Sequence, residues 1–153
     1  VYKRQALSEV FFSQRERLLS ENQRAHPRFR YAYQFSQAER VVVAAPFWDL
    51  SFPALLKIYI ENICVDGITF GANERGTYGL CKAKRLLLLT TRGGDYHDSP
   101  LEMGARYLEA LCDFWGIPRF DVVAADSLDL GQEAVNVILD RAIANAIKLA
   151  DRF

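Results

Sequence analysis

The chain has 153 residues, of which 50% are hydrophobic, so it is long enough to bury a substantial core within one domain. Its 19 Lys and Arg residues balance 19 Asp and Glu residues. The chain therefore has no net field that would recruit nucleic acid, and no apolar run approaches the ~18 residues that a membrane span needs. Cys64, Cys81 and Cys112 are odd in number and widely spaced, which predicts reduced thiols in a cytoplasmic protein rather than disulfides or a zinc site.

Two helical stretches open the chain. Residues 1–5 have no evident structural role and Val1 is not a start methionine, so we set them aside as a candidate non-native junction. Pro27 begins the second helical stretch, in which we expect Phe29, Tyr33 and Phe35 to join the core. The first stretch is predicted from apolar residues at helical spacing, namely Leu7, Val10, Phe11, Leu18 and Leu19.

Residues 41–45 read Val-Val-Val-Ala-Ala, a run that predicts a strand buried on both faces of a parallel sheet. Pro46 ends this strand because it has no N–H to donate to a ladder. Pro53 suits the first position of the next helix, and Asp66-Gly67 suits its end because Gly67 can adopt the left-handed conformation. The inner face of this helix is predicted to carry Leu56, Ile60 and Ile63.

Residues 69–81 contain Gly71, Gly76 and Gly79 and show little helical periodicity. They predict a short hairpin, which we place over the ligand crevice. Residues 86–91, Leu-Leu-Leu-Leu-Thr-Thr, predict the next buried strand.

Ser99-Pro100-Leu101-Glu102 matches a capping box, so we expect a helix with Pro100 at its first position. Gly116-Ile117-Pro118 ends that helix. Its apolar face is predicted to consist of Leu101, Ala105, Leu108, Leu111, Cys112 and Trp115.

Residues 120–125 predict a third apolar strand, and Gly131 precedes a last helix. The stripe of this helix is the most regular in the chain: Val135, Ile138, Leu139, Ala142, Ile143, Ala146 and Ile147. Alternating strands and helices imply right-handed crossovers, and therefore a three-layer α/β/α sandwich with a parallel sheet.

Two loops follow the ends of successive strands, where an open α/β sheet forms its ligand crevice. Phe47 and Trp48 offer broad apolar faces in the first loop, and Arg92 offers a cation in the second. Gly93-Gly94 lets backbone N–H groups approach a ligand closely because no Cβ intervenes. Taken singly, Phe47-Trp48 also fits a pair of side chains that pack in the core, and Gly93-Gly94 also fits an ordinary tight turn. Together they predict a site for a flat, conjugated, partly polar ring.

The order and spacing of these segments, from about residue 29 onward, resemble the FMN-dependent NADH-azoreductases. These enzymes are NADH:quinone oxidoreductases with a flavodoxin-like fold. The segments that carry the resemblance are Ala45-Pro46-Phe47-Trp48-Asp49-Leu50-Ser51-Phe52-Pro53, Leu56-Lys57-Ile58-Tyr59-Ile60, Gly67-Ile68-Thr69-Phe70 and Arg92-Gly93-Gly94.

The resemblance implies a homodimer with one FMN per subunit, reduced by NADH and reoxidised by a quinone or an azo compound in a two-step, ping-pong mechanism. The flavin does the chemistry while the protein supplies position and hydrogen bonds. The family pattern assigns the flavin ring to Pro46, Phe47, Trp48, Asp49, Leu50, Thr91, Arg92, Gly93 and Gly94, with Tyr96 at the edge of the ring.

The chain departs from the family at its beginning, because no serine-rich loop that would hold the FMN phosphate is recognisable. We therefore expect residues 1–153 to form a single, N-terminally truncated flavodoxin-like domain. Of the strand order 2-1-3-4-5, strands three to five would remain, with the edge of an inner strand bare. Such a chain should bind FMN weakly or not at all, whereas a chain extended upstream should purify yellow.

The second departure is Asp49, where the family commonly has asparagine. An aspartate there accepts from the N3–H of the ring, or it points to solvent, or it caps the helix near Pro53. His97 stands beside the second loop, but an exposed histidine without a role explains it better, and we assign no side chain as general acid.

Two other functions remain open at this stage. The first is a flavodoxin-like FMN electron carrier, although such carriers are usually strongly acidic and this chain is neutral. The second is an inactive fragment without cofactor. A phosphate-receiver domain fits poorly, because it needs clustered acids at the end of a strand, whereas proline and aromatic residues follow residues 41–45.

Overall fold

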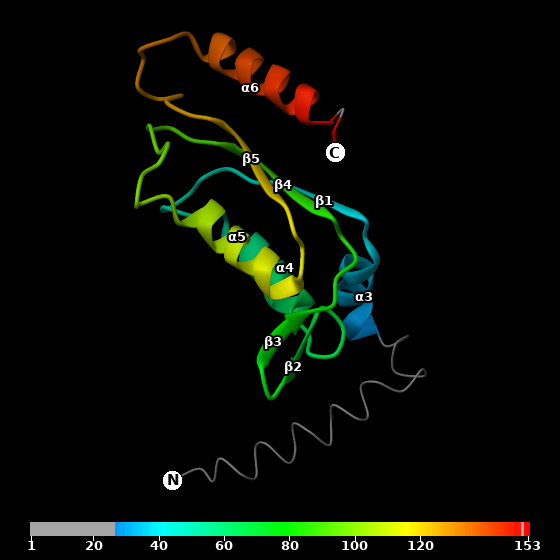
Figure 1. The fold of residues 1–153 in the computed structure, drawn as a ribbon. Coiled ribbons are helices and arrows are strands. Elements are labelled where there is room, and N and C mark those ends of the chain that lie inside the picture. Colours follow the sequence, from blue (N-terminus) through cyan, green and yellow to red (C-terminus); the bar gives the residue numbers. More distant parts are fainter. Residues whose placement is uncertain (1–26, 151) are drawn as a thin grey trace, which may run out of the picture.

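A computed structural model describes residues 27–150 and 152–153 of the chain (Figure 1). The helix predicted from Leu7 to Leu19 lies outside these residues, as do residues 1–5. The described elements are η1 (Pro27–Phe29), α3 (Arg30–Gln37), β1 (Arg40–Ala44), α4 (Ala54–Ile63), β2 (Phe70–Asn73), β3 (Gly76–Gly79), β4 (Arg85–Thr91), α5 (Met103–Trp115), β5 (Phe120–Ala125) and α6 (Val135–Ala150).

The main sheet is parallel, with the strand order β1-β4-β5. In register, Val43 pairs with Leu88, and Leu88 pairs with Val122. Figure 1 shows α3, α4 and α5 on one face of the sheet and α6 on the other. The predicted three-layer α/β/α arrangement is confirmed, and each predicted sheet strand matches an observed one to within a residue at either end. That residues 1–153 form a single domain stays a prediction.

The core lies between the sheet and the layer of α3, α4 and α5. Leu86 and Leu88 of β4 face Leu108 of α5, and the ring of Phe35 packs edge-on against Trp115 with centroids 4.7 Å apart. The other buried members are Ile60, Ile63, Ala83, Cys112 and Ile117. The predicted inner faces of α4 and α5 are therefore confirmed at their buried positions, although Leu101 lies outside α5 and is exposed.

The expectation that β1 is buried on both faces is wrong. Its burial alternates, and Val42 is 55% exposed. Among the described strands β1 pairs only with β4, and the described helices cover just one of its faces, where Val41 and Val43 pack on the core. Pro46 fits this edge position, because Ala45 and Phe47 on either side donate to Leu89 and Thr91 of β4 (3.0 and 2.9 Å). The missing N–H therefore falls on the side away from β4.

Two predicted helix boundaries are also wrong. α4 ends at Ile63 rather than at Asp66-Gly67, and Gly67 takes its positive φ of 80° in the turn that follows. α5 begins at Met103 rather than at Pro100, and its N-cap is Glu102. Ser99 does not cap the helix, because its hydroxyl accepts from the Leu101 N–H in the preceding turn.

The predicted hairpin exists as β2 and β3, but it does not lie over the carboxyl ends of the strands. Because α5 runs antiparallel to the sheet, its C-terminus lies at the amino ends of the strands (Figure 1). The hairpin packs there, and the Cys81 N–H just after it donates to the Trp115 carbonyl (3.1 Å). Gly116 caps α5 with a positive φ of 75°, as its sequence predicts.

The apolar stripe of α6 is only partly covered by the described residues. Ile138 is buried, but Ile143 is 56% exposed. A groove of about 420 Å³ runs between α6 and the sheet, past Ala45 and Thr91.

All three cysteines are free thiols. Burial raises the pKa of Cys64, and it raises the pKa values of Cys81 and Cys112 to about 12. These side chains therefore stay protonated and unreactive at neutral pH. Within the described residues, no helix is long and apolar enough to cross a membrane.

The contact between the hairpin and α5 depends on a glycine. A Cβ on Gly79 would lie 2.0 Å from the Gly116 nitrogen and from the Trp115 carbonyl carbon, both backbone atoms. Gly79→Ala should therefore destabilise the protein by about 1–3 kcal/mol, as overpacking typically does. Urea unfolding measures this, with Thr77→Ala on the exposed side of the same strand as the control. Equal midpoints for the two variants would contradict the packing described.

Candidate functional site

The loop after β1 contains a tight turn with strained backbone. Trp48 and Ser51 exchange two backbone hydrogen bonds, of 3.1 and 2.8 Å. Between them, Asp49 and Leu50 have positive φ values of 49° and 66°, the arrangement of a type I′ turn. Glycine, asparagine and aspartate favour these positions, so Asp49 is well suited and Leu50 is not. Strain of this kind clusters at functional sites.

The turn is held from two sides. Phe47 donates to the Thr91 carbonyl of β4 (2.9 Å), and the Leu50 carbonyl accepts from the Met103 N–H at the start of α5 (3.0 Å). The loop of residues 46–50 is therefore braced between the adjacent strand and the next helix.

Gly93 and Gly94 in the loop after β4 are bound through their carbonyl groups. The Gly93 carbonyl accepts from the Asp129 N–H (2.9 Å), and the Gly94 carbonyl accepts from the Ser127 N–H (3.0 Å). Their own N–H groups donate to no described residue. A Cβ on Gly93 would lie 2.2 Å from Oδ2 of the exposed Asp129 side chain, which would have to turn away to accommodate it.

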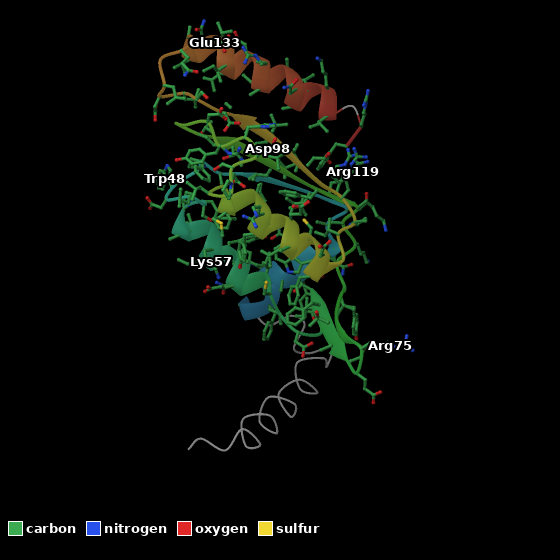
Figure 2. All side chains as sticks on the ribbon, turned by 60° about the vertical axis from the view of Figure 1, so that its left-hand side comes forward. Trp48, Lys57, Arg75, Asp98, Arg119 and Glu133 are labelled. Carbon is green, nitrogen blue, oxygen red and sulfur yellow. The ribbon has the colours of Figure 1, made fainter. Side chains whose placement is uncertain are left out.

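Aromatic rings gather beside these amides. The Phe47 and Tyr96 rings pack with centroids 4.5 Å apart at an interplanar angle of 49°. Trp48 is 59% exposed, and Figure 2 shows it at the edge of the molecule, at the end of the sheet from which the loops emerge. The structure thus brings together both predicted loops and Tyr96.

Arg92 does not extend into solvent as a free cation. Its side chain is buried and forms ion pairs with Glu102 (3.2 Å) and Asp126 (3.3 Å). Its guanidinium also lies 5.6 Å from the centre of the Phe47 ring. One buried cation thus joins the three loops after β1, β4 and β5 to the first turn of α5.

Glu102 and Asp126 are site residues that the sequence analysis missed. Both Glu102 carboxylate oxygens accept from the Ala105 N–H (3.0 Å), so the residue caps α5 while it neutralises Arg92. Glu102 appears in the sequence only as the last residue of a supposed capping box. An acidic residue directly before the first residue of a helix, as Glu102 is before Met103, is a usable N-cap signal. The pairing of Glu102 with Arg92 leaves no local pattern in the sequence.

The structure separates some of the alternatives for Asp49 and His97. The proposal that Asp49 caps α4 is wrong, because the N-cap residue of α4 is Pro53 and no side chain forms a capping hydrogen bond at that end of the helix. Asp49 is exposed at the tip of the turn. His97 is also exposed, and its Nδ1 lies 3.0 Å from Asp98 Oδ2. In the described residues, no group of three His, Cys, Asp or Glu side chains could hold a metal ion.

Comparison with known proteins places this geometry in a family. A family model described as "Flavodoxin-like fold" matches residues 3–150. The FMN-dependent NADH:quinone oxidoreductase 2 of Clostridium acetobutylicum is 47% identical over 131 residues, which cover 84% of this chain and 66% of that protein. The FMN-dependent NADH:quinone oxidoreductase of Clostridium beijerinckii is 40% identical over 134 residues, covering 88% and 68%. The chain belongs to the family of FMN-dependent NADH:quinone oxidoreductases.

Solved structures agree with the family assignment. The azoreductase from Bacillus anthracis str. Sterne superposes with a TM-score of 0.75 at 30% identity, covering 82% of this chain and 62% of that one. An FMN-dependent NADH-azoreductase from Bacillus anthracis str. Ames Ancestor, in complex with FMN, has a TM-score of 0.78 over 99% of this chain and 74% of that one. At 24% identity it supports the fold alone.

The chain spans about two thirds of the length of its curated relatives: 66% of the Clostridium acetobutylicum protein and 63% of one from Clostridium perfringens.

The buried ion pairs give a stability test. Arg92→Met should destabilise the protein by about 3–5 kcal/mol, because it leaves Glu102 and Asp126 without their cation, and Glu102 is buried. The control is Lys57→Met, which breaks an exposed pair with Glu61 (2.6 Å) on α4 and should leave the urea midpoint almost unchanged. Similar losses of stability for both variants would show that the Arg92 ion pairs stabilise the protein no more than an exposed ion pair does.

Proposed function

We propose that the protein binds FMN and passes electrons from NADH to quinones and azo compounds. The observation that carries this proposal is the pair of glycine amides, Gly93 and Gly94, that donate to no described residue beside the packed rings of Phe47 and Tyr96. A flat ring with one polar edge needs both features. Family membership supports the same cofactor, since the relatives are named FMN-dependent NADH:quinone oxidoreductases.

The residues that hold the flavin ring in this proposal come from both loops. The Gly93 and Gly94 amides donate to its polar edge, where they stabilise negative charge that develops on reduction. Phe47, Trp48 and Tyr96 supply apolar surface for the ring. The remaining members of the site are Pro46, Asp49, Leu50, Thr91 and Arg92.

When bound, FMN would supply the redox chemistry, which is hydride transfer from NADH to the acceptor. In this proposal the protein leaves one position beside the flavin ring open, and NADH and the acceptor occupy it in turn. This shared position is the basis of the ping-pong order. The strained turn of residues 48–51 presents Trp48 at the surface, beside that position. No side chain is assigned a proton-transfer role. Arg92 acts from beneath, by fixing the loops.

We also propose that the protein is a homodimer through the exposed apolar face of α4. Leu55 is 77% exposed, and Ile58 and Tyr59 lie beside it on the same helix. A groove of about 580 Å³ continues this face past Tyr31 and Pro46. A second copy of the chain would cover this face and would border the loop of residues 46–50. Three free thiols fit the proposed cytoplasmic location.

The activity is tested with a chain extended upstream and loaded with FMN, while the 153-residue chain, which should bind FMN weakly or not at all, is titrated with FMN beside it. We expect NADH oxidation with a menadione-type quinone, slower reduction of azo dyes, and sedimentation as a dimer. Alternating substrate addition should show that NADH reduces the flavin before the quinone binds. Fast electron exchange with ferredoxin-like partners, without quinone turnover, would instead identify an electron carrier.

Asp49 should tune the flavin if it lies at the edge of the ring. Its negative charge opposes reduction, so Asp49→Asn should raise the midpoint potential by roughly 10–30 mV, where about 30 mV corresponds to about 1.4 kcal/mol for two electrons. Asp98→Asn is a matched control, because Asp98 is also exposed and has a positive φ of 54°. Spectroelectrochemical titration measures both variants. Equal potentials for both variants and the parent would place Asp49 in solvent, away from the ring.

A further inference from the structure

A second concave site lies at the amino ends of the strands. It is a hollow of about 630 Å³, which we call the basic hollow. Six cationic side chains line it: Arg40, Lys82, Lys84, Arg85, Arg119 and Arg152. In Figure 2, Arg119 of this hollow and Trp48 of the flavin loops lie at opposite ends of the sheet. The basic hollow is therefore separate from the proposed flavin site.

The carboxylates of the described residues balance only part of the positive charge in the basic hollow. Arg85 and Arg119 share Asp121, at 3.0 and 3.3 Å. The other four cations form no ion pair with any described residue. Glu39 is the one acid that lines the hollow among the described residues. A chain with no net charge thus concentrates surplus positive charge in one concave place.

Helix ends explain only part of this concentration. The C-termini of α3 and α5 lie at this end of the sheet, and cations can stabilise such termini. Neither of these helices has a basic residue in its last turn. The helix α6, which ends beside the hollow, has Lys148 in its last turn and Arg152 just after its end. The cations come from the start of β1, the segment before β4, the segment before β5 and the residues after α6.

Arg85 is the one buried cation of the hollow among the described residues. Its Nη1 donates to the Arg152 carbonyl (2.6 Å), and its Nε faces Asp121. Lys82 and Lys84 stand exposed at the rim. A buried guanidinium with exposed ammonium groups around it suits an anion with several oxygens, because arginine and lysine both bind phosphate.

We propose that the basic hollow binds an oligophosphate anion of about the size and charge of a triphosphate. The four cations that form no ion pair with a described residue match the four negative charges of such a group, and the volume lies within the range of small-ligand sites. The ring of Phe153, with its centroid 5.6 Å from the Arg85 guanidinium, offers a surface beside the phosphates where a nucleobase could lie.

The test is calorimetric titration of the 153-residue chain with sodium tripolyphosphate at low ionic strength, because salt screens such contacts. We expect one site per chain. Lys82→Glu and Lys84→Glu should each weaken binding at least about tenfold, as expected when a charge-assisted contact is replaced by repulsion. Arg75→Glu is the matched control, since it makes the same charge change on the exposed hairpin outside the hollow, and it should bind like the parent chain.

Circular dichroism checks that each variant is folded. We expect all three variants to fold because the substituted side chains are exposed. Absence of binding by the parent chain, or equal weakening by Arg75→Glu, would overturn the proposal. A parallel titration with a nucleoside triphosphate separates the two sources of the group. Equal affinity would identify the phosphate chain alone as the ligand, and tighter binding would add a nucleobase on Phe153.

Discussion

The site depends on one buried cation. A guanidinium removed from water is costly unless carboxylates neutralise it, and Arg92 meets this requirement with Glu102 and Asp126, at 3.2 and 3.3 Å. These partners belong to different segments, so satisfying one charge fixes the start of α5 and the position of the loop after β5. The same guanidinium lies over Phe47, which extends its influence to the loop after β1.

This framework explains how strained and unpaired groups persist at the surface above it. Leu50 has a positive φ of 66°, a conformation that a leucine adopts only when its surroundings enforce it. The Met103 N–H bond to its carbonyl provides that enforcement. In the same way, Ser127 and Asp129 hold the carbonyls of Gly94 and Gly93, and the glycine amides are left without partners among the described residues. Donors positioned before a ligand arrives need no reorganisation when charge develops.

The two ends of the parallel sheet carry different chemistry. The loops at the carboxyl ends present aromatic rings and backbone amides, whereas the amino ends gather arginine and lysine side chains. A net charge of +0 conceals this separation, because composition records totals and not positions. The topology creates it, since every strand of the main sheet points the same way and each connection returns to the same end.

The sequence by itself determined the strands, the layer order and the two loops that meet at the carboxyl ends of the sheet. Apolar runs such as residues 86–91 have few alternatives to a buried strand, and Gly116 carries its own local signal for a helix end. Only the tertiary structure decided where α5 begins, because the cap that wins is the residue that also neutralises Arg92, ten positions earlier in the chain. It likewise decided that Val42 is exposed and that the hairpin packs on Gly116. These outcomes depend on contacts between distant segments, which no local pattern of residues encodes.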